Sequence, residues 1–272
     1  CSLPPIKTER QKEDTIYFIM EKADIDLQDL LSKQYPGDYD FLYKLMMDIL
    51  LAVEFMHNKL IIHRDIKPSN ILIRDGIAKL CDFGISKPFM EYSPQTPKIT
   101  TSWYRAPEMI YSTDYDFKSD MWSIGCVFYE MVARTRLYEG VPDRDHSLMS
   151  RVFTFSKIDE GYINRNCKKF LAAFKSNSGK RKSIEDMIKE DRGKDKALKI
   201  PEFREICKII TSLLSFKPQN RPTATELLDG KFFLKYRDEI EDVRVTYNSL
   251  HIPDTTVQRV ICVERVWAID YA

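Results

Sequence analysis

The spacing of apolar residues changes from strand-like to helix-like early in the chain. Residues 15–20 combine β-branched and aromatic side chains, and they predict a short buried strand. From Tyr39 to Met56 the apolar residues recur every three or four positions, which predicts one amphipathic helix. Residues 71–73 and 77–80 predict two short strands, because the Arg-Asp-Gly between them favours a tight hairpin turn. The pattern therefore predicts one helix between a strand and a hairpin.

Helical patterns dominate the middle of the chain. Residues 85–102 are rich in Ser, Thr and Pro without a sustained period, and they predict a loop. Amphipathic runs at 117–132, 201–214 and 223–228 predict three helices, the last with Thr223 as its N-cap. Strands early and helices later indicate an α+β fold or a mostly helical lobe of a larger fold.

Two later stretches carry other patterns. Residues 166–199 are basic, which is typical of a solvated helix–loop insert, with a docking patch as the alternative. Residues 257–271 have apolar side chains at helical spacing and predict a C-terminal helix. Apolar residues still accumulate where this pattern stops, so we expect the chain to be a piece of a larger protein.

The composition is that of a globular chain with little net charge. Of 272 residues, 43% are hydrophobic and 31% are charged, which is enough apolar material for a sizeable core. The 42 Lys and Arg nearly balance the 41 Asp and Glu, so we expect no nucleic-acid partner. No apolar run approaches the ~20 residues of a membrane helix and no leader opens the sequence, so we expect neither a membrane partner nor secretion. Six cysteines without a C-x-x-C pair favour free thiols and a cytoplasmic or nuclear location.

The strongest chemical signal is a set of three motifs in order: His63-Arg64-Asp65-Ile66-Lys67-Pro68-Ser69-Asn70, Asp82-Phe83-Gly84 and Ala106-Pro107-Glu108. Phosphoryl transfer needs a carboxylate for the proton of the attacking hydroxyl, a cation for the transferring phosphoryl and oxygen ligands for Mg²⁺. Asp65 and Lys67 supply the first two from one loop, because residues two apart in extended backbone point the same way. Asn70 and Asp82 supply hard oxygen ligands. The motifs therefore indicate phosphoryl transfer.

These motifs resemble the signature of the eukaryotic protein kinases over roughly residues 12–235. Lys67 is the residue that serine/threonine kinases have at its position. The runs at 101–108 and 120–126 are similar to those of the CMGC group, which includes the cyclin-dependent and MAP kinases. The resemblance implies an α+β fold, a mostly helical kinase large lobe with a short hinge strand and small β-hairpins.

The resemblance assigns ATP and Mg²⁺ as cofactors and gives four residues roles in the chemistry. Asp65 would be the catalytic base, and Lys67 would neutralise the γ-phosphoryl group of ATP. Asn70 and Asp82 would hold Mg²⁺.

Four more residues are implied to form the adenine pocket. Met20 would guard its back, and the hinge that follows would bind adenine through its backbone at Glu21 and Ala23. Leu72 would form the apolar floor beneath the base.

Further positions are implied to shape the surroundings of the site. Glu108 would pair with Arg221 as a structural ion pair, and Asp120 would brace the catalytic loop. Arg105 would shape a pocket in which a backbone N–H lacks a good partner. Proline has no backbone N–H, so a substrate with proline after the acceptor would be favoured.

Activation is implied to depend on Thr96, whose phosphate would be bound by Arg64 and Lys87. The alternative for Thr96 is an exposed loop threonine without a role, since Ser, Thr and Pro are common in loops. Thr101 would lie beside Asp65 as a structural contact.

The N-terminal end departs from the kinase pattern. Residues 1–20 contain no glycine and no Val-Ala-x-Lys, so neither the phosphate loop nor the strand lysine of the family is found there. We expect residues 1–20 to be a remnant of the small lobe, 21–235 to be the large lobe and 236–272 to be an extension of unknown fold. With the small lobe missing, this piece alone is expected to be inactive.

Two functions stay open at this point. The first is a serine/threonine kinase acting on protein substrates, with a cyclin-like activator or an upstream activating kinase as further partners. The second is a noncatalytic binding or scaffold module that lacks a small lobe. The presence of Asp65, Lys67, Asn70 and Asp82 together favours the first, because a module without chemistry has no need of them.

Overall fold

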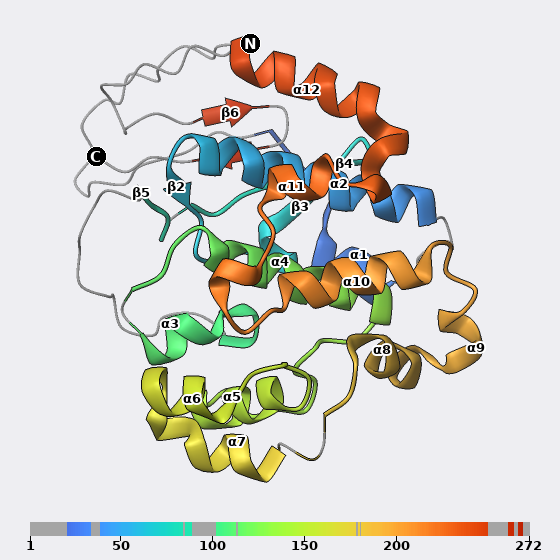
Figure 1. Cartoon of the computed structure of the whole chain (residues 1–272). Helices are drawn as coiled ribbons and strands as arrows, with labels where there is room; N and C mark the ends of the chain where they lie inside the picture. Colours follow the sequence, from blue (N-terminus) through green and yellow to red (C-terminus); the bar gives the residue numbers. More distant parts are fainter. Residues whose placement is uncertain are drawn as a thin grey trace, which may run out of the picture.

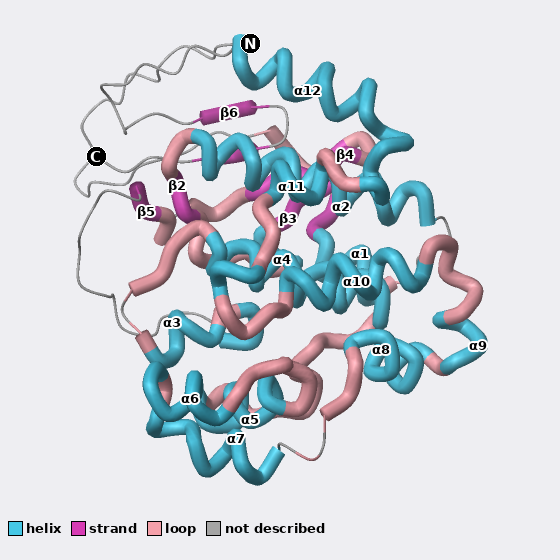
Figure 2. Tube along the Cα trace, in the orientation of Figure 1, coloured by secondary structure: helices cyan, strands magenta, loops and turns pink. Residues whose placement is uncertain are grey.

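Helices make up most of the described residues, and short strands gather on one side of them (Figures 1 and 2). The structure, a computed structural model, describes residues 21–33, 39–83, 85–88, 102–112, 114–177, 179, 181–249, 261–263 and 266–268. The predicted strand at 15–20 lies outside these ranges. Within them, no helix is both long and apolar enough to cross a membrane. The predicted α+β class with mostly helical content is confirmed.

The elements follow one another closely along the chain. The strands are β1 (Ile25–Asp26), β2 (Ile61–Ile62), β3 (Ile71–Arg74), β4 (Ile77–Leu80), β5 (Lys87–Pro88), β6 (Ile261–Val263) and β7 (Val266–Ala268). The longer helices are α2 (Tyr39–Asn58), α4 (Lys118–Ala133), α5 (Asp145–Phe153), α8 (Ile184–Arg192), α10 (Phe203–Leu213) and α12 (Arg237–Ser249). The shorter helices are α1 (Leu27–Ser32), α3 (Pro107–Tyr111), α6 (Glu160–Asn166), α7 (Leu171–Asn177), α9 (Lys194–Ala197) and α11 (Ala224–Leu228). The 3₁₀ turns are η1 (Pro68–Asn70), η2 (Ser102–Tyr104), η3 (Lys168–Phe170), η4 (Pro218–Asn220) and η5 (Lys231–Tyr236).

The hairpin β3–β4 forms where the sequence predicts it. Its strands are antiparallel, with Ile71 opposite Leu80 and Arg74 opposite Ile77. The turn residues have φ angles of 51° at Asp75 and 79° at Gly76, and the Asp-Gly pair adopts such left-handed angles readily. The sheet has the order β1-β3-β4-β7-β6, so the hairpin lies at its centre.

Helix α2 confirms the predicted helix and supports this sheet, but it lacks the polar face that the prediction implied. It is buried on all sides from residue 45 to 56, because β4 covers one side and α11 and α12 cover others. One buried carboxylate of α2 reaches the sheet: Asp48 accepts a hydrogen bond of 3.0 Å from the backbone N–H of Ala78 in β4. The central strand is thus fastened to the longest helix.

Helices α4 and α10 form the centre of the helical part, where Figure 1 shows them side by side. They approach closely at Gly125, where a Cβ atom would lie 2.9 Å from side-chain atoms of both Leu213 and Leu214. The predicted helices at 117–132 and 201–214 are therefore confirmed. The third prediction is confirmed as α11, whose N-cap Thr223 forms a capping box with Glu226.

The predicted helix at 257–271 is wrong in the part that the structure describes. Residues 261–263 and 266–268 are the antiparallel strands β6 and β7, and β7 pairs in parallel with β4 at Leu80. The described residues of this stretch are mainly β-branched or aromatic, which favours strands. Apolar spacing cannot separate the two states over so short a run.

The beginning of the stretch 236–272 folds on the same lobe. Helix α12 packs against α2, with the rings of Tyr247 and Phe55 4.7 Å apart. Arg244 of α12 also donates to both carboxylate oxygens of the buried Glu54, at 2.8 and 3.0 Å. Helix α12 therefore belongs to the lobe, a point that the sequence left open.

Candidate active site

The loop between β2 and β3 holds one buried carboxylate, Asp65, which is 9% exposed. The Lys67 Nζ lies 2.6 Å from its Oδ2 atom, and the Asn70 Nδ2 donates to the same oxygen at 3.0 Å. Asn70 also donates to the Asp65 backbone carbonyl at 2.9 Å. Both donors contact Oδ2, and among the described residues no donor to the other carboxylate oxygen is found, which leaves it for an incoming proton donor. The structure thus brings together three of the four predicted chemical residues.

His63 connects this loop to the segment that carries Asp82. Burial lowers the pKa of His63 below its ordinary value, although the charge of Asp120 and the Cys81 carbonyl act in the opposite direction. The neutral ring can donate from Nε2 to the Cys81 carbonyl at 3.1 Å and accept the Asp65 N–H at Nδ1, 3.3 Å away. In addition, the Cys81 N–H donates to the Asn70 carbonyl at 3.0 Å. The two motifs are therefore held side by side.

Asn70 and Asp82 have the donor chemistry for a divalent cation. Both amide hydrogens of Asn70 point at Asp65, which leaves its amide oxygen as a ligand, and the Asp82 side chain is exposed. Among the described residues, no group of three or more His, Cys, Asp and Glu side chains gathers to hold a metal. Two protein oxygens suit Mg²⁺ bound together with nucleotide phosphates and water, so these residues fit the implied cation.

Asp120 of α4 lies beneath the loop and is fully buried. It accepts hydrogen bonds from the backbone N–H groups of His63 and Arg64, both at 2.9 Å, and it contacts the His57 ring at 3.0 Å. Burial by itself would raise the pKa of Asp120, but the His57 hydrogen bond and the nearby histidines bring it below its usual value. The backbone at Arg64 has a left-handed φ of 73°, and Asp82 has one of 62°. Asp120 thus helps to hold a loop whose backbone is unfavourable for a residue with a side chain.

Glu108 and Arg221 meet in the interior. Arg221 donates to both carboxylate oxygens, at 2.5 and 2.8 Å, and both residues are at most 3% exposed. The same guanidinium donates to the backbone carbonyls of Ser215, Phe216 and Lys118. The pair therefore connects α3 to the turns that follow α10.

The segment 21–23, called the hinge segment below, lies beside β3. The Asp24 N–H donates to the Ile73 carbonyl at 2.9 Å, and Ala23 is half-buried. Leu72, also half-buried, faces Asp26 in β1 and Lys79 in β4 across the sheet. The structure places Glu21, Ala23 and Leu72 in one region, while Met20 lies outside the described residues.

The residues predicted for activation are described only in part. Thr96 and Thr101 lie outside the described residues. Lys87 is placed by its backbone alone, in β5 opposite Ile62. The Arg64 guanidinium lies 5.7 Å from the centre of the Tyr115 ring, and its buried Nε has no hydrogen-bond partner in the described structure. Arg64 therefore retains donor capacity for an anion.

Sequence reasoning missed a contact between the stretch before Ala106 and helix α4. The Tyr104 hydroxyl donates to the buried Glu130 at 2.6 Å, and Arg136 lies 3.7 Å from the same carboxylate. Burial raises the pKa of Glu130, against the opposing effects of Tyr104 and Arg136. The guanidinium of Arg136 also lies 5.1 Å from the ring centre of Trp103. These contacts fix the backbone next to Arg105, which is half-buried. In the sequence, only the neighbouring Trp103-Tyr104-Arg105 could have indicated these contacts.

Comparison with known proteins assigns the chain to a family. The family model for the protein kinase domain matches residues 6–233, most of the chain. The chain belongs to the protein kinase family. Mitogen-activated protein kinase 5 of Oryza sativa subsp. indica is 31% identical over 243 residues, which are 86% of this chain and 61% of that kinase. This chain therefore spans less than two thirds of that relative.

Two further relatives and one solved structure extend the comparison. The mitogen-activated protein kinase HOG1 of Wallemia muriae is 30% identical over 235 residues, 84% of this chain and 78% of that protein. The serine/threonine-protein kinase ppk23 of Schizosaccharomyces pombe is 42% identical over 135 residues, 48% of this chain and 34% of its own. A crystal structure of the yeast RNA Pol II CTD kinase CTDK-1 complex superposes with a TM-score of 0.65 at 26% identity, covering 78% of this chain and 69% of that one. The predicted likeness to CMGC kinases is confirmed.

Proposed function

We propose that the protein is a serine/threonine protein kinase that transfers the γ-phosphoryl group of Mg-ATP to hydroxyl groups of protein substrates. The observation that carries this proposal is the state of the Asp65 carboxylate. Lys67 and Asn70 donate to one of its oxygens, and within the described part of the chain the other is left for a hydroxyl donor. The relatives support it, since they are named as mitogen-activated and serine/threonine-protein kinases.

In this mechanism the chain orients the hydroxyl and offsets charge. Asp65 accepts the proton of the attacking hydroxyl at the oxygen that its neighbours leave open. Lys67, within 2.6 Å of Asp65, presents its positive charge to the transferring phosphoryl. Asn70 and Asp82 would hold Mg²⁺, which when bound would neutralise charge on the phosphates. The hinge segment binds adenine through its backbone at Glu21 and Ala23, with Leu72 beneath the base and Met20 behind it.

Substrate choice and activation follow as finer proposals. Arg105 shapes the pocket for the residue after the acceptor, so proline is preferred there. A phosphate on Thr96 is bound by Arg64, whose Nε has no partner in the described structure, together with Lys87. Ordering of that loop places Thr101 beside Asp65. An upstream kinase or a cyclin-like activator supplies the switch, and the protein works in the cytoplasm or nucleus.

Replacing Asp65 by Asn tests the proposal, since it keeps the shape and removes the base. Turnover of the whole protein on a generic basic protein substrate should fall by roughly 10²- to 10⁴-fold, the usual contribution of general-base catalysis. Asp238→Asn is the matched control, because Asp238 is an exposed residue of α12. An Asp65→Asn variant as fast as the wild type would refute the proposal. A wild-type protein that binds protein partners but shows no turnover after phosphorylation would favour the noncatalytic module.

A further inference from the structure

Three charged side chains join the hinge segment to the hairpin β3–β4; Glu21, Arg74 and Lys79 are called the hinge cluster here. The two carboxylate oxygens of Glu21 are divided between its partners: Arg74 lies 2.5 Å from Oε1, and Lys79 lies 2.9 Å from Oε2. The Lys79 side chain is 12% exposed, while those of Glu21 and Arg74 are 32% and 35% exposed. Lys79 is therefore the partner that water screens least.

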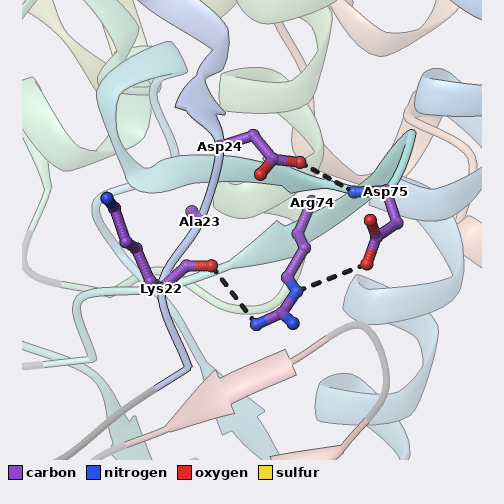
Figure 3. A pocket seen from close by; sticks show the side chains of 5 residues that line it. All are labelled: Lys22, Ala23, Asp24, Arg74 and Asp75. Carbon is purple, nitrogen blue, oxygen red and sulfur yellow. Dashed lines mark hydrogen bonds and ion pairs between the residues drawn. The ribbon is translucent and has the colours of Figure 1, made fainter.

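Backbone contacts reinforce the same junction. Arg74 donates to the Lys22 carbonyl at 3.3 Å, and the Asp75 N–H donates to the Asp24 carboxylate at 2.9 Å (Figure 3). An open pocket lies between the hinge segment and the hairpin turn, and Figure 3 shows the residues that line it. Its volume is about 440 Å³. The junction is thus built from side chains of both segments and does not depend on one ion pair.

The same hairpin leads directly to the proposed metal ligand. Lys79 precedes Asp82 by three positions in the chain, and its neighbour Ala78 is fastened to α2 through Asp48. The position of β4 is therefore fixed by a buried contact on one side. The hinge segment takes its position from β4 and the adjoining turn through the hinge cluster.

We propose that Lys79 and Arg74 are positioning residues for nucleotide binding: they hold Glu21, and with it the hinge backbone, at a fixed place relative to Asp82. The inference rests on the proposed function, because it requires adenine on the hinge segment and phosphates near Asp82. A hinge that is already ordered loses less conformational freedom when the nucleotide binds. The cluster touches no reacting atom, so it stabilises bound ATP equally in the ground and transition states.

The charge state of Glu21 agrees with this role. The Lys79 hydrogen bond is the largest influence on its pKa, and together with both cations it outweighs partial burial and lowers that pKa below the ordinary value. Glu21 therefore stays ionised at neutral pH and keeps both partners.

Steady-state kinetics of the whole protein test the proposal through Lys79→Met. The KM for ATP should rise roughly two- to fivefold, the range expected for a partly exposed ion pair, while kcat and the KM for the protein substrate stay unchanged. Lys79→Arg should restore the KM for ATP, since it keeps the charge. Arg74→Met should have a smaller effect, because its side chain is more exposed. Lys208→Met, which removes an exposed pair with Glu205 on α10, is the control.

The outcomes distinguish the positioning role of Lys79 from the kinase function on which it rests. An unchanged KM for ATP in Lys79→Met, or faster turnover, overturns the positioning role while wild-type kinase activity still stands. Equal losses in kcat and in both KM values would show a general structural defect and would also overturn it. If Lys79→Met does not fold, Glu21→Gln replaces it, because that side chain is more exposed. Absence of Asp65-dependent turnover in the wild type refutes the kinase function itself.

Discussion

The ion pair that joins α3 to the turns after α10 is buried, whereas the ion pairs of the basic insert at residues 166–199 lie at the surface. Arg221 and Glu108 lie 2.5 Å apart with side chains that are 0% and 4% exposed. Lys182 and Glu190 lie 2.7 Å apart, yet their side chains are 53% and 58% exposed. The distances are similar, but water screens only the second pair. Burial therefore decides, more than distance does, how much the loss of one partner changes the free energy of unfolding.

In the insert, carboxylates near the lysines offset part of their positive charge. Lys175 pairs with Glu160 at 2.9 Å, and Lys189 pairs with Glu185 one helical turn earlier at 2.5 Å. Helix α8 also begins with an N-cap at Ser183, whose side chain accepts the Asp186 N–H. These features agree with a solvated insert, and a docking patch at this position stays a hypothesis.

The largest effect is expected from Arg221→Met. This change leaves the Glu108 carboxylate buried and unpaired, so the free energy of unfolding should fall by about 3–5 kcal/mol. Urea unfolding measures it. Adding Glu108→Leu should recover part of the loss, because no unpaired charge then remains buried. A loss below about 1 kcal/mol in the single variant would show that burial does not set the contribution of this pair.

An intermediate effect is expected from the pH dependence of His63. Its pKa in the folded protein lies below the ordinary value because the ring is buried. Below about pH 6.5 the unfolded chain binds a proton at His63 that the folded protein does not yet bind. The contribution of His63 to the free energy of unfolding is therefore complete above that pH. It decreases as the pH falls, by up to about 1.4 kcal/mol per pH unit.

Urea unfolding at two pH values, on either side of that point, measures the contribution of His63. The variant His63→Gln keeps an N–H donor for the Cys81 carbonyl but cannot titrate, so its stability should change less between the two conditions. The two proteins differ at this position alone, so the difference in their pH dependence measures the contribution of His63. Identical pH dependence would contradict the buried neutral ring.

The smallest effect is expected in the insert. Lys182→Met should change the free energy of unfolding by less than about 0.5 kcal/mol, because the pair with Glu190 is exposed. The same measurement on Lys175→Met provides a matched second pair. A loss comparable to that of Arg221→Met would erase the contrast between the two regions.

The catalytic loop was predictable because its chemistry fixes both residue types and spacing. Asp65, Lys67 and Asn70 stand within a few positions, and short-range backbone geometry brings their side chains together. The hairpin was equally accessible, since Asp75 and Gly76 form a local turn signal. Helix α2 followed from its apolar spacing. Local rules were sufficient for each of these features.

The missed contacts join residues that are distant in the sequence. Glu21 and Lys79 are 58 positions apart, and His57 and Asp120 are 63 apart, so only the folded chain brings them together. Neither pair belongs to a short motif with fixed spacing. The error at residues 257–271 has a different origin: a few apolar residues fit a helix and a strand equally well, and pairing with β4 favours the strand.

The left-handed backbone at Arg64 and Asp82 has a consequence for how related sequences can drift. Such angles suit glycine best, so a residue with a side chain at either position strains the backbone. In a related protein without phosphoryl transfer, glycine would relieve the strain at both positions. Asp120 would then be less necessary for holding the loop. At residues 64 and 82 the side chains that the proposed chemistry uses and the backbone angles that stability favours are therefore opposed.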